Sequence, residues 1–317
     1  MRATPRPASP SWSGSSAPPL HRASVVVSSG AKSETRKNET RENEKKESRE
    51  EAMTALRIFR CVIAALVLGL SPAPAEDDPW PGLADDIFKG RPIADGTGLL
   101  AVEMPARAED AAIVPVTMRA ALPDDDPRRV KALTLVIDHN PAPVAATFTL
   151  GDNVRTATLA SRVRVNSYTN VHLVAELSDG KLYAVQTFVK ASGGCAAPAL
   201  KNADEARRTL GQMRFRLFPP EGSNTAREAQ IMIRHPNNSG LQMDQLTRHY
   251  IPPFFVRELK IWQGDALVLA MEGGISLSED PNIRFSYVPN GAATFRVEAT
   301  DTDDNVFTGE WPATSAM

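Results

Sequence analysis

The chain has 317 residues, with 36 lysines and arginines against 38 aspartates and glutamates. Beyond residue 75, where we place the end of an export signal, 24 basic residues stand against 31 acidic ones, a net charge of about −7. An acidic chain without a basic stripe is a poor ligand for nucleic acid or an anionic membrane, so both are excluded as partners. The remaining 242 residues are enough for two modest domains.

The first 52 residues lack the composition of a folded domain. Residues 1–30 are rich in Ser, Pro and Ala, and the next twenty have almost no apolar side chain to bury. Such a segment cannot offset the entropy lost on ordering. We expect either a disordered extension or a mis-annotated one, with translation starting at Met53, because residues 47–52 are what a purine-rich ribosome-binding sequence would encode.

Residues 53–75 have the pattern of a cleavable signal peptide. Arg57 and Arg60 form the basic region, residues 61–70 are the apolar stretch, and residues 73–75 offer an Ala-x-Ala cleavage site. The apolar stretch is too short to span a membrane. We therefore expect a periplasmic protein with no membrane span in its mature form.

Residues 76–190 are predicted to form a first all-β domain. Apolar residues alternate along short runs that are separated by turn signals about every ten residues, which is typical of a sandwich or barrel. Only residues 83–88 look helical in this part. The expected strands lie around Val114–Met118, Leu133–Ile137, Phe148–Leu150, Val163–Val165, Val171–Leu177 and Leu182–Val189.

Residues 213–317 are predicted to form a second small sandwich, after a helical stretch near residues 204–210. The fold class is therefore all-β, with two sandwich domains joined by the segment 191–212. The expected strands are Met213–Leu217, Ala229–Arg234, Phe254–Trp262, Ala266–Met271, Ile283–Val288, Thr294–Ala299 and Val306–Trp311.

The segment 191–212 contains Cys195, the single cysteine that remains after the signal peptide. A lone thiol in an oxidising compartment is buried, paired with another molecule or used chemically. Gly193 and Gly194 precede it and small residues follow it, which favours an exposed thiol on a flexible arm over a cysteine packed as a small hydrophobe. Lys190 and Lys201 are distant in sequence, so we expect a thiol pKa near its ordinary value of about 8.5.

No other pattern indicates an enzyme or a cofactor. No two histidines stand at metal-ligand spacing, so we expect no metal site. His139 and His235 precede turns, which favours capping or surface roles, and His172 points outward from its strand. Cys195 has no base, metal set or nucleotide motif beside it, so we expect a protein without a catalytic site and without a cofactor.

Motifs in both halves resemble one family in the expected order. The first half is similar to SoxY and the second to SoxZ, the two partners of the periplasmic sulfur carrier in thiosulfate oxidation. The resemblance implies immunoglobulin-like sandwiches that pair tightly, with Cys195 as the residue that carries covalent sulfur intermediates. The motifs are Val114-Pro115-Val116, Asp138–Pro143, Arg162–Val165, Ser178–Gly180 and Gly193–Cys195, then His235-Pro236, Ser239-Gly240, Ile251–Phe255 and Asp280–Phe285.

The order of the segments departs from the separate SoxY protein, whose cysteine arm is the C-terminus. Here the chain continues beyond Cys195, so the arm is a loop with less reach. Fused forms resemble a subgroup associated with pyrroloquinoline-quinone-dependent alcohol dehydrogenases. Implied partners are sulfur-oxidising enzymes, cytochromes or a quinoprotein dehydrogenase, and an exposed Cys195 also permits a disulfide-linked dimer. The alternative function is an accessory subunit or chaperone of such a dehydrogenase, with Cys195 dispensable.

Overall fold

The computed structural model describes residues 45–57, 59, 78–152, 154–198, 203–219 and 226–313. The described residues 78–313 belong to one compact unit, and the described residues 45–57 and 59 belong to a separate N-terminal unit. In the N-terminal unit, residues 45–57 and 59 are helical and exposed. Residues 45–52, the described part of the predicted extension, are helical, which fits the good helix formers Glu and Lys in this run. The prediction of a disordered or mis-annotated extension over residues 1–52 stays a prediction. Most of the predicted signal peptide, including Cys61, lies outside the described residues.

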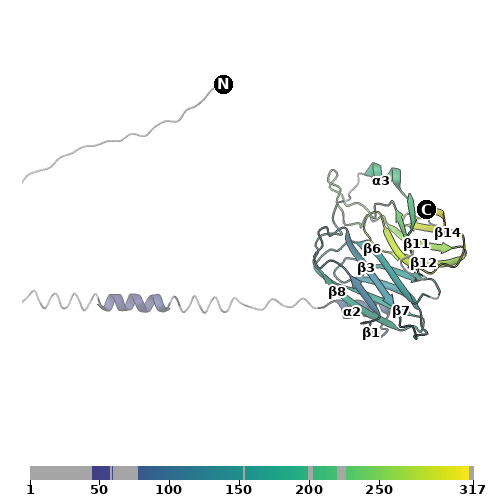
Figure 1. Ribbon diagram of the computed structural model, residues 1–317. Helices are drawn as coiled ribbons and strands as arrows, with labels where there is room; N and C mark the ends of the chain where they lie inside the picture. Colours follow the sequence, from purple (N-terminus) through teal and green to yellow (C-terminus); the bar gives the residue numbers. More distant parts are fainter. Residues whose placement is uncertain are drawn as a thin grey trace, which may run out of the picture. The chain divides into compact units, whose positions relative to one another are not determined.

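The compact unit is built from strands, with two short helices, as predicted (Figure 1). The two stretches that looked helical are helices, and the strands fall on the alternating runs. The sequence did not reveal β1 and β2, which are too short to show a period. The first half contains α2 (Trp80–Phe88), β1 (Ile93–Asp95), β2 (Leu100–Glu103), β3 (Val114–Ala121), β4 (Val130–Ile137), β5 (Val144–Leu150), β6 (Thr156–Val163), β7 (Thr169–Leu177) and β8 (Leu182–Val189).

The second half follows the segment that contains Cys195. It contains α3 (Ala203–Thr209), β9 (Met213–Leu217), β10 (Arg227–Ile233), β11 (Val256–Gln263), β12 (Ala266–Gly273), β13 (Asn282–Tyr287), β14 (Thr294–Asp301) and β15 (Val306–Pro312).

Both sheets run from one half into the other. The larger sheet has the order β1-β8-β7-β4-β5-β12-β11-β14-β15, and the smaller has the order β2-β3-β6-β13-β10-β9. Thus β5 pairs with β12, and β6 pairs with β13, both antiparallel. The predicted two-sandwich fold is confirmed, and each sandwich continues the sheets of the other. The boundaries at residues 190 and 213 stay a prediction, because the two halves share these sheets.

One apolar core extends through both halves. Alternation explains its composition: in β3 the side chains of Val114, Val116 and Met118 point inward and are buried, while Pro115 is exposed. Leu159 of β6 and Phe285 of β13 face each other across the junction in the same buried cluster. Burying this shared surface ties the halves together through the hydrophobic effect as well as through backbone hydrogen bonds.

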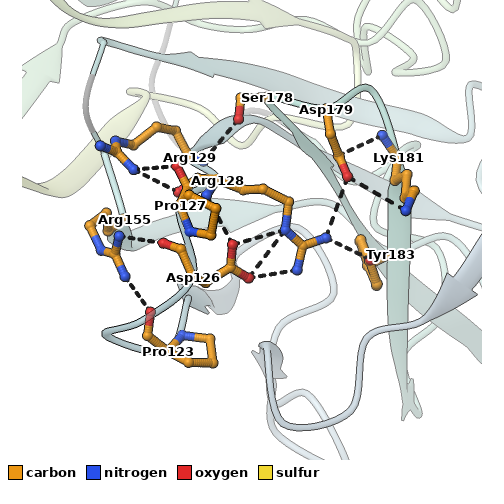
Figure 2. Close-up of polar contacts among 10 residues, drawn as sticks. All are labelled: Pro123, Asp126, Pro127, Arg128, Arg129, Arg155, Ser178, Asp179, Lys181 and Tyr183. Carbon is orange, nitrogen blue, oxygen red and sulfur yellow. Dashed lines mark hydrogen bonds and ion pairs between the residues drawn. The ribbon is translucent and has the colours of Figure 1, made fainter.

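A polar cluster closes the end of β8 that lies away from Cys195 (Figure 2). The Arg128 guanidinium donates from Nε to Asp126 Oδ1 at 2.9 Å and from Nη2 to Asp126 Oδ2 at 2.6 Å. Its Nη1 donates to the Tyr183 hydroxyl at 2.8 Å and lies 3.6 Å from Asp179 Oδ2. The Arg155 guanidinium donates to two backbone carbonyls of the same loop. These contacts fasten the β3–β4 loop to the β7–β8 turn.

Candidate functional site

Cys195 is buried, so the prediction of an exposed thiol is wrong. Its exposed fraction is 0%, and it is the free cysteine of the described residues. The segment that carries it runs on from β8 and packs against the end of the first sandwich instead of extending into solvent. Small residues around a thiol, which we took as a sign of exposure, serve here to let the backbone pack closely.

Backbone hydrogen bonds fasten the segment to the stretch that follows β6. Gly193 N donates to Asn166 O at 2.8 Å, and Gly194 N donates to Val165 O at 3.0 Å. Ala196 N donates back to Gly193 O at 3.2 Å, which closes a tight turn around the cysteine. The predicted flexible linker is therefore a bound segment at this point of the chain.

Each of the two glycines has its own steric reason to be glycine in the closed segment. A Cβ on Gly194 would lie 2.0 Å from Ala111 O and 2.7 Å from Val165 O, so a side chain cannot fit without moving backbone. Gly193 has open space around its Cα but a φ of +78°, a conformation that other residues adopt only with strain. In the closed segment the two glycines thus allow close packing and a turn, and their predicted role in arm flexibility stays a prediction.

The second half covers the cysteine from the other side. The Ser239 hydroxyl donates to Cys195 O, and Gln242 Nε2 donates to Ala197 O at 3.1 Å. Gln242 Oε1 in turn accepts a hydrogen bond from the backbone N of Ser239 at 3.0 Å, which holds the Gln242 side chain against the Ser239 turn. Both residues are buried. The thiol segment thus lies between the SoxY-like and SoxZ-like halves and is bonded to each.

Arg164 is the charged residue next to the thiol. Its side chain is only 1% exposed, yet it donates only to two carbonyls, from Nη1 to Gly194 O at 3.2 Å and from Nη2 to Asn237 O at 3.3 Å. Its Nε has no partner. The sequence assigned Arg164 no role beyond the motif Arg162–Val165, because an arginine that alternates with Val163 and Val165 gives no sign of burial. The strand β6 ends at Val163, and the backbone then turns the guanidinium inward.

Burial and charge act on the thiol in opposite directions. Desolvation raises the pKa of Cys195, while the guanidinium of Arg164 lowers it, and the net shift is upward. The expectation of an ordinary thiol pKa is therefore wrong for the closed segment. Desolvation likewise lowers the pKa of Arg164, and the thiolate of Cys195 is the leading influence that raises it. In this arrangement the thiol is a protected, largely neutral group.

A buried turn of the second half contributes a further polar group. Asn237 is fully buried with a φ of 43°, and its Oδ1 accepts from Val256 N at 3.2 Å. Its Nδ2 has no partner. His235 is buried beside it rather than at the surface, with Nδ1 accepting from Asn237 N at 3.1 Å and Nε2 3.4 Å from Asp301 Oδ2. Desolvation lowers the pKa of His235.

His172, which was predicted to point outward from its strand, lies outside the site around Cys195. His172 points away from the sandwich core, as expected, but Trp80 of α2 stacks on it at 3.6 Å, and its Nδ1 lies 2.9 Å from Asp138 Oδ1. Within the described ranges, no group of three or more His, Cys, Asp or Glu side chains is placed to hold a metal ion.

Comparison with known proteins divides the chain at the cysteine. The family model "Sulfur oxidation protein SoxY" matches residues 84–195, and "Sulphur oxidation protein SoxZ" matches residues 219–312. No curated protein matched the chain.

Among solved structures, the sulfur carrier protein SoxY from Chlorobium limicola f. thiosulfatophilum is 23% identical, with a TM-score of 0.31. It covers 36% of this chain and 91% of its own. A superoxide reductase (neelaredoxin) from Ignicoccus hospitalis is 9% identical, with a TM-score of 0.25, over 29% of this chain and 79% of its own.

Proposed function

Since the chain belongs to the SoxYZ-like sulfur carriers, with a SoxY and a SoxZ domain fused in one polypeptide, we propose that Cys195 holds a covalent sulfur intermediate and presents it to partner enzymes. One observation carries the proposal: the SoxY match ends on Cys195, at the segment that the structure hydrogen-bonds to both halves. A carrier needs one thiol on a segment with its own conformational freedom, and the chain devotes both domains to holding such a segment.

The chemistry of loading defines the kind of partner. When the Cys195 thiolate joins a thiosulfate anion, an S–S bond forms and two electrons leave the sulfur atoms. We assign no electron acceptor to this chain. A partner enzyme that contains one, such as a cytochrome, must therefore take those electrons. We therefore assign loading and unloading to partner enzymes and no catalytic site to the carrier itself.

Presentation requires the bound segment to open. The hydrogen bonds that hold it are few: they join it to Asn166, Val165, Arg164, Ser239 and Gln242. Each contributes roughly 0.5–1.5 kcal/mol net, so their sum is comparable to what docking of a partner enzyme can offset. The carrier would then protect a bare thiol when alone and expose it only in the complex.

We place this function in the bacterial periplasm. The signal-peptide pattern at residues 53–75 supports this location. In the described part of the chain, no helix is long and apolar enough to cross a membrane. A link to a quinoprotein alcohol dehydrogenase is the narrower proposal, supported by the fused order of the two domains.

Mutant strains of the source organism distinguish the carrier function from the alternative function as an accessory subunit. We expect Cys195→Ala to abolish sulfur oxidation as completely as deletion of the gene, with normal amounts of the variant protein. Cys195→Ser is the matched control, since it keeps the size of the side chain and loses the sulfur. If oxidation of sulfur compounds or alcohols survives Cys195→Ala and fails on deletion, the carrier function is wrong and an accessory role replaces it.

A further inference from the structure

We propose that Arg164 and Asn237 form an anion-binding site for a negatively charged adduct on Cys195. The inference rests on the proposed carrier function and deepens it, because it names the residues that recognise the cargo and the charge they select. Arg164 comes from the first half and Asn237 from the second, so the site exists only where the two domains meet.

Unused hydrogen-bond donors are the first observation. In the part of the chain that the structure describes, three side chains that are at least nine-tenths buried contain a polar atom without a partner: Asp138, Arg164 and Asn237. Two of these atoms, Arg164 Nε and Asn237 Nδ2, are donors. They belong to neighbouring residues, since Arg164 Nη2 donates to Asn237 O at 3.3 Å. Buried donors are rarely left unpaired, so this pair needs an explanation.

Unbalanced charge is the second observation. Arg164 forms no ion pair with a described residue, although it is almost completely enclosed, and burying a guanidinium without a counter-charge is costly. Its Nη1 holds the carbonyl of Gly194, which places the guanidinium at the cysteine segment. Because the Cys195 thiol is largely neutral in the closed segment, the carboxylates of Glu279 and Asp110 are the charges that favour the charged form of Arg164.

An anionic adduct would meet both needs at once. A thiosulfonate group, Cys195–S–S–SO3⁻, carries a negative charge and oxygen acceptors, which the Arg164 Nε–H and the Asn237 amide can bind with charge-assisted hydrogen bonds. A bare thiol or an uncharged adduct offers neither. The closed segment should therefore be more stable when the cargo is anionic, and the carrier would hold such a cargo until a partner enzyme binds it.

Chemically prepared adducts test the site without depending on loading in the cell. Tetrathionate converts the thiolate to Cys195–S–S–SO3⁻ and releases thiosulfate. Methyl methanethiosulfonate gives the neutral Cys195–S–S–CH3 and releases methanesulfinate. Each adduct is then exposed to a water-soluble phosphine, which cleaves the S–S bond and is oxidised to its oxide with oxygen from water. The rate of loss is followed on the Cys195 peptide by mass spectrometry in the full chain.

We expect Arg164→Met to speed release of the thiosulfonate by at least about tenfold, equivalent to about 1.4 kcal/mol, and to change release of the methylthio group less than twofold. Asn237→Asp, which keeps the acceptor for Val256 N and replaces the donor, should act in the same direction. Arg162→Met is the matched control, because Arg162 is a partly buried arginine of the same stretch that donates to Asp280 O and not to a carbonyl of the cysteine segment.

Equal acceleration of both adducts would overturn the site, since it would show a loosened segment rather than lost anion recognition. An unchanged thiosulfonate rate in both variants would overturn it as well. Failure of the site and failure of the carrier function can be told apart. If protein purified from the source organism carries no adduct, the carrier function is wrong even if these release rates depend on Arg164. If that protein does carry an adduct and the release rates do not change in the variants, only the anion-binding site is wrong.

Discussion

Two arginines of the first half, Arg128 and Arg164, lie in opposite environments. Arg128 sits at the rim with a quarter of its side chain exposed, and each of its nitrogens has an acceptor (Figure 2). Arg164 is enclosed, donates to two carbonyls at 3.2 and 3.3 Å, and leaves Nε unused. The partly exposed arginine is thus well bonded, and the deeply buried one is not.

The difference separates a structural contact from a functional one. The partners of Arg128 belong to the β3–β4 loop and the β7–β8 turn, so its bonds complete the fold of one domain. The missing partner of Arg164 is not supplied by either domain. A fold does not gain stability from an incompletely bonded buried cation, which is why we assign that cation to the chemistry of the neighbouring thiol.

The largest expected effect comes from breaking the enclosed region. Gly194→Ala places a Cβ 2.0 Å from Ala111 O and must displace the segment. We expect alkylation of Cys195 by iodoacetamide to become at least about tenfold faster, which corresponds to about 1.4 kcal/mol of lost closure. Gly82→Ala is the control, because its Cβ meets open space on α2 and its backbone is helical, so the substitution causes neither a clash nor strain. Equal labelling rates in both variants would contradict the closed segment.

A second prediction compares how much each of the two arginines contributes to the free energy of unfolding. Arg128→Met removes charge-assisted bonds to Asp126 and Tyr183, and we expect a loss of about 1–2 kcal/mol in the free energy of unfolding. Arg164→Met removes a poorly compensated charge, so it should cost less than Arg128→Met although Arg164 is far more buried. Urea denaturation of both variants measures this order, and a larger loss for Arg164→Met would reverse the assignment of roles.

A smaller effect should appear in acid. The hydrogen bonds from Arg128 lower the pKa of Asp126 from 3.8 to about 2. Because the folded state holds this carboxyl ionised, its contribution to stability is complete above pH 3.8 and is lost as the pH falls toward 2. The stability of wild type should therefore fall more steeply between pH 4 and 2 than that of Arg128→Met. Parallel pH profiles would show that Arg128 does not hold the carboxyl.

The sequence was informative where local patterns decide the structure. Alternation in runs such as Val114–Met118 predicted the strands, since one face of each strand is buried and the period is two. The continuity of the sheets was hidden, because pairing of Leu150 with Leu269 and of Ala160 with Arg284 joins strand edges more than a hundred residues apart. Alternation within one strand says nothing about which edge it meets.

The sequence identified Cys195 as the candidate site residue, but it did not predict that the thiol is buried beside Arg164. Cys195 stood out as a lone thiol, but glycine beside it serves close packing as well as mobility, and only the contact of Gly194 with Ala111 O decides between them. Arg164 had no predicted role, because the alternation of Val163 and Val165 around it gives no sign that it is buried. Its inward turn depends on the end of β6 and on Ser276 O, which accepts from Arg164 N at 2.7 Å, a contact between the two halves.

The intact mass of the protein, purified without reductant from its source organism during sulfur oxidation, tests the central claim most directly. We predict an added mass equal to sulfur atoms or a sulfur oxyanion, which reductant removes and which is absent from Cys195→Ala. A bare thiol in wild type under every growth condition would contradict the account and leave Cys195 as a buried contact between two domains.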